Sequence, residues 1–159
     1  MKKLGLFFMV FACAAFLMAP VWAADNPRPA ATKLAKDLAA RYGQSMPQDT
    51  YYYLVDLVSN VKTAGYSTVF VLTNYDSTSR LRVQGFVIPM GAMPGDEEVV
   101  DIWLEPYGVK YVNLDDYLGN ENGWALLYSG SDFGCGALIF NSTGVQGMTW
   151  IKPWYWYTD

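Results

Sequence analysis

Aromatic residues concentrate near the C-terminus, and they are the residues most suited to binding. Trp154, Tyr155, Trp156 and Tyr157 follow one another directly. In an extended chain, Trp154 and Trp156 lie on one face, and Tyr155 and Tyr157 lie on the other. Exposed aromatic rings form flat platforms for sugar rings or for apolar groups of a protein partner. We therefore predict a ligand or partner site on these four residues. The alternative is that one face fills the core and the other packs against the strand of residues 51–53.

Carboxylates gather in two other places. One group is formed by Asp96, Glu97, Glu98 and Asp101, and the other lies within residues 113–122. Such oxygen-rich loops can hold calcium, and paired carboxylates are the acid, base or nucleophile of glycosidases. However, the spacing matches no calcium-loop signature. We therefore predict that both groups are solvated turns, with no metal site and no cofactor.

Hydroxyl side chains occur beside glycine in two short segments, residues 129–134 and 142–144. Serine and threonine need an adjacent base to become nucleophiles, and histidine is the most frequent one. The 159-residue sequence contains no histidine. We therefore predict that both segments are hairpin turns, that the chain has no catalytic residue, and that the protein is not an enzyme.

The first residues have the pattern of a secretory signal peptide. Two lysines precede the apolar run 4–18, and small residues with cleavage-site spacing end at Ala23. The run is short for a membrane span, which needs about 20 residues. We predict a signal peptide over residues 1–23, no membrane span in the mature protein, and a periplasmic or secreted location. A lipid anchor on Cys13 is the alternative, disfavoured because the apolar run continues beyond this residue.

The mature chain is acidic. Removing Lys2 and Lys3 with the signal leaves 9 basic residues against 15 acidic ones, a net charge of −6. A surface of this sign repels phosphate backbones, and no basic stripe is present to offset the repulsion. We predict that nucleic acid is not a partner.

The mature chain also keeps one cysteine, Cys135, so it cannot form an intramolecular disulfide. This residue lies inside the apolar stretch 134–140. We predict that it is buried and behaves as a small apolar side chain. A reactive or dimer-bridging thiol is the alternative.

A short amphipathic helix is expected before the main domain. Leu34, Leu38 and Tyr42 repeat every four residues, and Gly43 is a natural helix stop. We predict a helix over residues 30–42, inside an N-terminal helix and linker that span residues 24–50. The helix packs on the domain, serves as a spacer, or binds a membrane surface or partner.

The remainder, residues 51–159, is expected to form one β-sandwich domain. The predicted strands are rich in β-branched and aromatic residues and are bounded by turn-forming residues. They cover residues 51–58, 67–74, 80–90, 97–104, 109–113, 123–128, 134–141 and 148–157. Seven to eight short strands after a single helix favour an antiparallel sandwich or a small barrel over βαβ units.

Several of these strands are apolar on both faces, namely residues 69–72, 124–128 and 137–140. A strand with one solvated face alternates instead, as residues 80–84 do. The outer faces of the doubly apolar strands therefore need a cover. The helix of Leu34 and Leu38 is the simplest candidate, and a second subunit is the alternative.

A wider pattern accompanies these strands. Residues 66–74 end a strand in Asn74, residues 81–87 follow as its pair, and Leu104-Glu105-Pro106-Tyr107-Gly108 forms a turn. This arrangement resembles secreted bacterial immunoglobulin-like sandwich modules. The resemblance implies an immunoglobulin-like fold and an extracytoplasmic location, and it brings no catalytic residues with it.

Together these observations predict an exported, non-enzymatic β-sandwich. We expect it to recognise a protein partner in the cell envelope or to associate with itself. The alternative is a module that binds glycans or cell-wall polysaccharide through its C-terminal aromatic residues.

Overall fold

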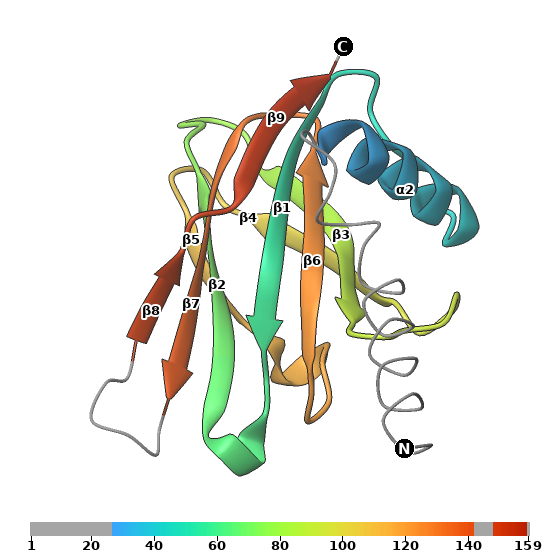
Figure 1. Cartoon of the computed structure of the whole chain (residues 1–159). Helices are drawn as coiled ribbons and strands as arrows, with labels where there is room; N and C mark the ends of the chain where they lie inside the picture. Colours follow the sequence, from blue (N-terminus) through green and yellow to red (C-terminus); the bar gives the residue numbers. More distant parts are fainter. Residues whose placement is uncertain (1–26, 142–147, 159) are drawn as a thin grey trace, which may run out of the picture.

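The computed structural model describes residues 27–141 and 148–158 (Figure 1). The predicted signal peptide, its cleavage site and the turn at residues 142–144 lie outside the described residues. The fold therefore does not test the predicted signal peptide or its cleavage after Ala23.

One helix precedes the strands. The helix α2 spans Arg28–Arg41, and the short helical turns η1 and η2 span Lys62–Ala64 and Leu114–Asp116. The strands are β1 (Thr50–Ser59), β2 (Tyr66–Asn74), β3 (Leu81–Pro89), β4 (Glu98–Leu104), β5 (Val109–Asn113), β6 (Asn122–Ser129), β7 (Phe133–Asn141), β8 (Met148–Ile151) and β9 (Trp154–Thr158).

The strands form two antiparallel sheets. The five-stranded sheet has the order β4-β3-β6-β1-β9, and the four-stranded sheet has the order β5-β2-β7-β8. Hydrogen-bonded neighbours are antiparallel throughout these two orders. The predicted mainly β, antiparallel sandwich with one preceding helix is confirmed. The immunoglobulin-like topology stays a prediction.

The predicted strand over residues 148–157 is wrong in one respect. The strand is interrupted at Lys152 and Pro153. As a result, β8 joins the four-stranded sheet and β9 joins the five-stranded one. Proline has no N–H to donate to a strand ladder, which explains why the strand cannot run through.

The main core lies between the two sheets. Phe70 and Leu72 of β2 meet Val83 of β3 and Leu127 of β6, and all four are fully buried. Alternate residues of each strand point into this layer because the side-chain period of a strand is two. The apolar strand patterns seen in the sequence supply both halves of this core.

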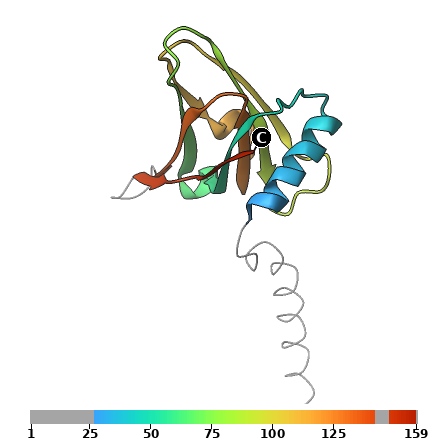
Figure 2. The ribbon, with the colours of Figure 1, turned by 90° about the horizontal axis from the view of Figure 1, so that it is seen from above.

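A second core lies on the outer side of the five-stranded sheet. Leu38 of α2 packs there with Phe86, Leu126 and Trp156, and each of them is buried. Figure 2 shows α2 lying along one side of the strands. The helix therefore covers the doubly apolar strand β6, as the sequence predicts. Gly43, with φ of +65°, adopts the left-handed conformation just beyond the helix end.

Candidate recognition surfaces

The outer side of the four-stranded sheet has no comparable cover among the described residues. We call the residues of β2, β5 and β7 that point to this side, together with Tyr75, the open face. Strand register places on it Ser67, Val69, Val71, Thr73, Val109, Tyr111, Asn113, Gly134, Gly136, Leu138 and Phe140. Tyr75 belongs to it because its ring lies against the outer side of Gly134, where an added Cβ would meet the tyrosine hydroxyl at 2.5 Å.

Exposure separates this face from the covered one. Val109 is 53% exposed, Tyr111 is 69% exposed, and Val69, Val71 and Leu138 are half-buried. On the five-stranded sheet, by contrast, Tyr52, Phe86, Leu126 and Tyr128 are fully buried under α2, and Val99 and Trp124 beside them are half-buried. The same kind of apolar strand is thus covered on one side of the molecule and accessible on the other.

The open face carries no charged side chain, although the predicted mature chain has a net charge of −6. Its exposed residues are Tyr75, Val109, Tyr111 and Phe140, together with the uncharged Asn113. Depletion of charge and enrichment in aromatic residues are the compositional marks of the centre of a protein interface. Isolated exposed apolar residues need no explanation, but a contiguous set marks an interaction site.

The four C-terminal residues predicted as a site are divided by the structure. β9 pairs with β1 so that Trp156 lies opposite Tyr52. Trp156 is only 7% exposed, stacks on the Tyr52 ring at 5.1 Å between centroids, and donates its indole N–H to the Thr32 hydroxyl at 2.9 Å. The structure therefore places Trp156 in the second core, beside Thr32 of the helix, and its role in binding a ligand or partner stays a prediction.

The other three of these residues remain accessible. Trp154, Tyr155 and Tyr157 are between 41% and 46% exposed. The Tyr155 ring packs beside Tyr51 and Tyr53, so the segment does lie along the strand of residues 51–53. Desolvation, together with the nearby Asp132, raises the pKa of Tyr155.

A shallow groove adjoins this exposed set. It has a volume of about 430 Å³ and is lined by Arg28, Lys152, Pro153, Trp154 and Tyr155. We call it the aromatic groove. Two aromatic rings beside two cationic side chains suit a polar ring compound such as a sugar, which stacks on one group and accepts hydrogen bonds from the other.

Sequence reasoning missed Trp103, which is half exposed on β4. The guanidinium groups of Arg80 and Arg82 each lie 5.7 Å from its ring centroid. Both arginines are already paired, Arg80 with Glu105 and Arg82 with Asp101, each at 2.6 Å. The cluster therefore consists of ion pairs and an aromatic ring that join neighbouring strands. Both of its arginines already have a carboxylate partner. In the sequence, the only indication of this cluster was the alternation of polar and apolar residues in 80–84. Predicting the contact with Trp103 also required knowing that β4 pairs with β3.

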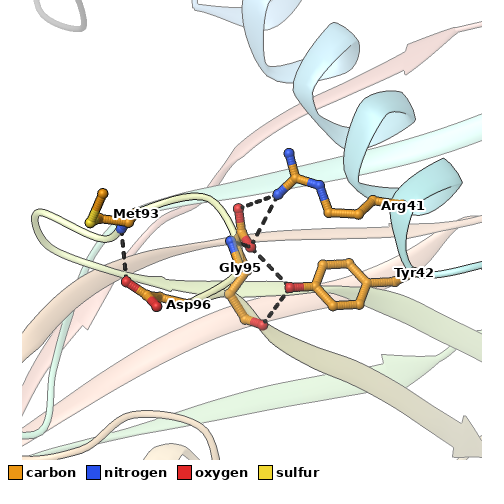
Figure 3. A network of polar contacts seen from close by, with 6 residues as sticks. Arg41, Tyr42, Met93, Gly95 and Asp96 are labelled. Carbon is orange, nitrogen blue, oxygen red and sulfur yellow. Dashed lines mark hydrogen bonds and ion pairs between the residues drawn. The ribbon is translucent and has the colours of Figure 1, made fainter.

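The carboxylates predicted to be solvated include one that is not. The Glu97 side chain is only 10% exposed and accepts hydrogen bonds from Arg41 at 3.1 Å and from the Tyr42 hydroxyl at 3.0 Å (Figure 3). It also accepts from the N–H of Gly95 at 2.8 Å. Glu97 therefore fastens the C-terminal end of α2 to the loop before β4. Within the described residues, no three cysteine or acidic side chains are grouped to hold a metal ion.

Acidification is expected to loosen this attachment. Desolvation acts to raise the pKa of Glu97, but the hydrogen bonds from Gly95 and Tyr42 and the charge of Arg41 hold it below its ordinary value of 4.5. A carboxyl whose pKa is lower in the folded state stabilises that state above its ordinary pKa. This stabilisation is lost as the pH falls through the folded value. Urea unfolding between about pH 6 and about pH 3 should show a falling midpoint, with a shallower fall in Glu97→Gln.

Glu98→Gln is the matched control, because Glu98 is an exposed neighbour on β4. Its midpoint should follow the unmodified protein. Equal pH profiles for Glu97→Gln and the unmodified protein would contradict the role given to Glu97.

Cys135 is less enclosed than predicted. Its side chain is partly buried and packs against the main core. It faces the sandwich opposite Leu72 of β2. Desolvation raises the pKa of Cys135 to about 12.

Native Cys135 should therefore react slowly with a thiol reagent. At pH 8 the thiolate fraction would be about a thousandfold smaller than for a thiol at the ordinary value of 9.0. Labelling with a maleimide or an aromatic disulfide should accelerate by about this factor in denaturant. Equal rates in the native and the denatured protein would refute the desolvation of this thiol.

No helix within the described residues combines the length and apolar character that crossing a membrane requires. Comparison of the chain with protein-family models, with curated proteins and with solved structures finds no match.

Proposed function

We propose that this protein is an exported, non-enzymatic β-sandwich that recognises a protein partner in the periplasm or outside the cell. The recognition surface is the open face of the four-stranded sheet. The predicted signal peptide over residues 1–23 supports export. The uncharged, accessible and apolar character of the open face supports partner binding.

One observation carries this proposal, namely the difference between the two outer faces. On the outer side of the five-stranded sheet, α2 buries large apolar residues of β1, β3 and β6, and leaves Trp103 and Trp154 exposed on the two edge strands. On the four-stranded sheet no helix among the described residues covers the outer side, and Val109, Tyr111 and Phe140 stay exposed. Each large apolar side chain gains about 1.5–3 kcal/mol when it is fully removed from water. A partner that covers the open face would recover this free energy.

The chemistry of the open face suits binding and not catalysis. It holds no carboxylate, amine or thiol, and its polar side chains are hydroxyls and the Asn113 amide. The tyrosines combine a large apolar ring with a hydroxyl that can remain hydrated at the rim of an interface. Non-enzymatic partner recognition is therefore the function we assign.

Site-specific photo-crosslinking in intact cells tests the proposal. A photoreactive phenylalanine analogue at position 111 replaces an exposed tyrosine at the edge of the open face. The same analogue at position 103 replaces an exposed tryptophan of the other sheet. We expect a discrete protein adduct from position 111, identified by mass spectrometry, and a much weaker one from position 103.

The proposal fails if irradiation gives no protein adduct at position 111, or equal adducts at both positions. A melting curve of each substituted protein establishes that the fold is retained. Both analogues replace exposed aromatic residues. A difference in adduct yield therefore reflects the position on the surface and not the exposure or the aromatic character of the residue replaced.

A second candidate function is glycan or cell-wall binding at the aromatic groove. The observation that favours it is the exposure of Trp154 and Tyr155 beside Lys152 and Arg28. Polysaccharide should then change the tryptophan fluorescence, and Trp154→Ala should abolish the change. Trp103→Ala, at an exposed tryptophan far along the same sheet, is the control. Retained binding by a folded Trp154→Ala protein would exclude this function.

A further inference from the structure

We propose that the partner of the open face is a second copy of this chain. Two molecules would pack their four-stranded sheets against one another, related by a twofold axis. This inference rests on the proposed function, and it adds the identity of the partner.

Charge favours this occupant. The chain has a net charge of −4, which becomes −6 when the predicted signal peptide is removed, so two copies repel one another over most of their surfaces. On the open face two copies can meet without bringing like charges together, because none of its side chains is charged. An anionic membrane surface is disfavoured for a related reason, since the face offers no lysine or arginine to lipid headgroups.

Shape also favours this occupant. A twofold interface needs a surface that is complementary to itself, and sheets pack face to face at about 10 Å when both faces are apolar. The sandwich already uses this packing between its own two sheets, with β2 and β7 contributing Phe70, Leu72 and Ala137. Their outward neighbours Val69, Val71 and Leu138 are residues of the same kind.

Area sets the expected strength. Strands β2 and β7 of the open face have nine residues each, and β5 has five. With a rise of about 3.3 Å per residue and a strand spacing of about 4.8 Å, the sheet presents on the order of 400 Å² per copy in projection. Two copies together fall below the roughly 1,200 Å² of standard interfaces. The dimer should therefore be reversible, with a Kd that is micromolar or weaker.

Sedimentation equilibrium of the mature chain from about 1 μM to about 1 mM tests the inference. The unmodified chain should pass from monomer to dimer within this range. Val109→Lys and Tyr111→Lys place like charges on the open face of both copies and should each weaken dimerisation about tenfold or more. Leu57→Lys is the matched control. It makes the same apolar-to-lysine exchange at an exposed position of β1, in the other sheet, and should leave the Kd unchanged.

Melting curves select the folded variants for comparison. A monomer throughout the concentration range would overturn the inference, and so would an equal loss of dimer in Leu57→Lys. Flotation of the chain with phosphatidylcholine vesicles that is lost in Val109→Lys would overturn it in favour of lipid.

The two proposals can be separated. If the chain stays monomeric while position 111 cross-links to a different protein, the dimer is wrong and partner recognition stands. If neither a dimer nor an adduct forms, both are wrong.

Discussion

Replacing Trp156 with alanine is expected to destabilise the fold by about 3–5 kcal/mol, the usual cost of removing a buried large aromatic side chain. Trp156 fills the space between β1 and α2, where it stacks on Tyr52 and donates a hydrogen bond to Thr32. The substitution therefore leaves a cavity in the second core and removes a link to the helix. Typical domains are stable by only about 5–15 kcal/mol, so the loss would be a large share of the margin. Urea unfolding of the mature chain measures it.

Trp154→Ala is the matched control, because Trp154 is on the same strand but 45% exposed. Its effect should be below about 1 kcal/mol. Similar losses for the two variants would show that Trp156 is not the anchor between sheet and helix.

Deleting residues 25–43 is expected to lower the melting temperature and to cause association. The deletion uncovers the outer side of the five-stranded sheet, where Phe86, Leu126 and Tyr128 are fully buried beneath α2. Leu38 alone is worth about 1.5–3 kcal/mol when fully buried. Differential scanning calorimetry and light scattering of the truncated chain measure the two effects.

The single substitutions Leu38→Ala and Leu34→Ala provide a finer comparison. Leu38 is buried, so its replacement should cost about 2–5 kcal/mol, whereas the half-buried Leu34 should cost less. An unchanged melting curve for the truncated chain would show instead that residues 25–43 are a spacer.

The strands and the helix were predictable because their signals are local. The helix predicted over residues 30–42 is found at Arg28–Arg41, and β3 lies within the predicted 80–90. Both faces of β2 and β7 are apolar in the sequence, which predicted that their outer side needs a cover. Periodicity shows which residues share a face of a strand or helix. That was enough to predict the positions of these elements and their apolar faces.

The assignment of strands to sheets was not predictable in the same way. Alternation does not say which partner a strand takes, so the division at Pro153 and the pairing of Trp103 with Arg82 needed the fold. For the same reason, Trp154 and Trp156 share a face but differ in burial. The helix covers Trp156 but not Trp154. The sequence pattern does not show where along β9 this cover stops.

Glu97 shows a second reason for failure. Its neighbours in sequence, Asp96 and Glu98, are exposed, and composition alone predicts that Glu97 is solvated as well. Its partners Arg41 and Tyr42 are more than 50 residues away in sequence. A carboxylate that fastens a helix to a distant loop therefore has no local signature.

Hydroxyl-radical footprinting tests the central claim, that the open face is covered by a partner in the cell. Tyr75 and Tyr111 are strongly exposed in the isolated chain, and Trp103 provides an exposed reference on the other sheet. We expect the oxidation of both tyrosines to fall severalfold in the intact envelope relative to the dilute purified protein, with Trp103 changing little. Equal oxidation of Tyr75 and Tyr111 in the two settings would contradict the account.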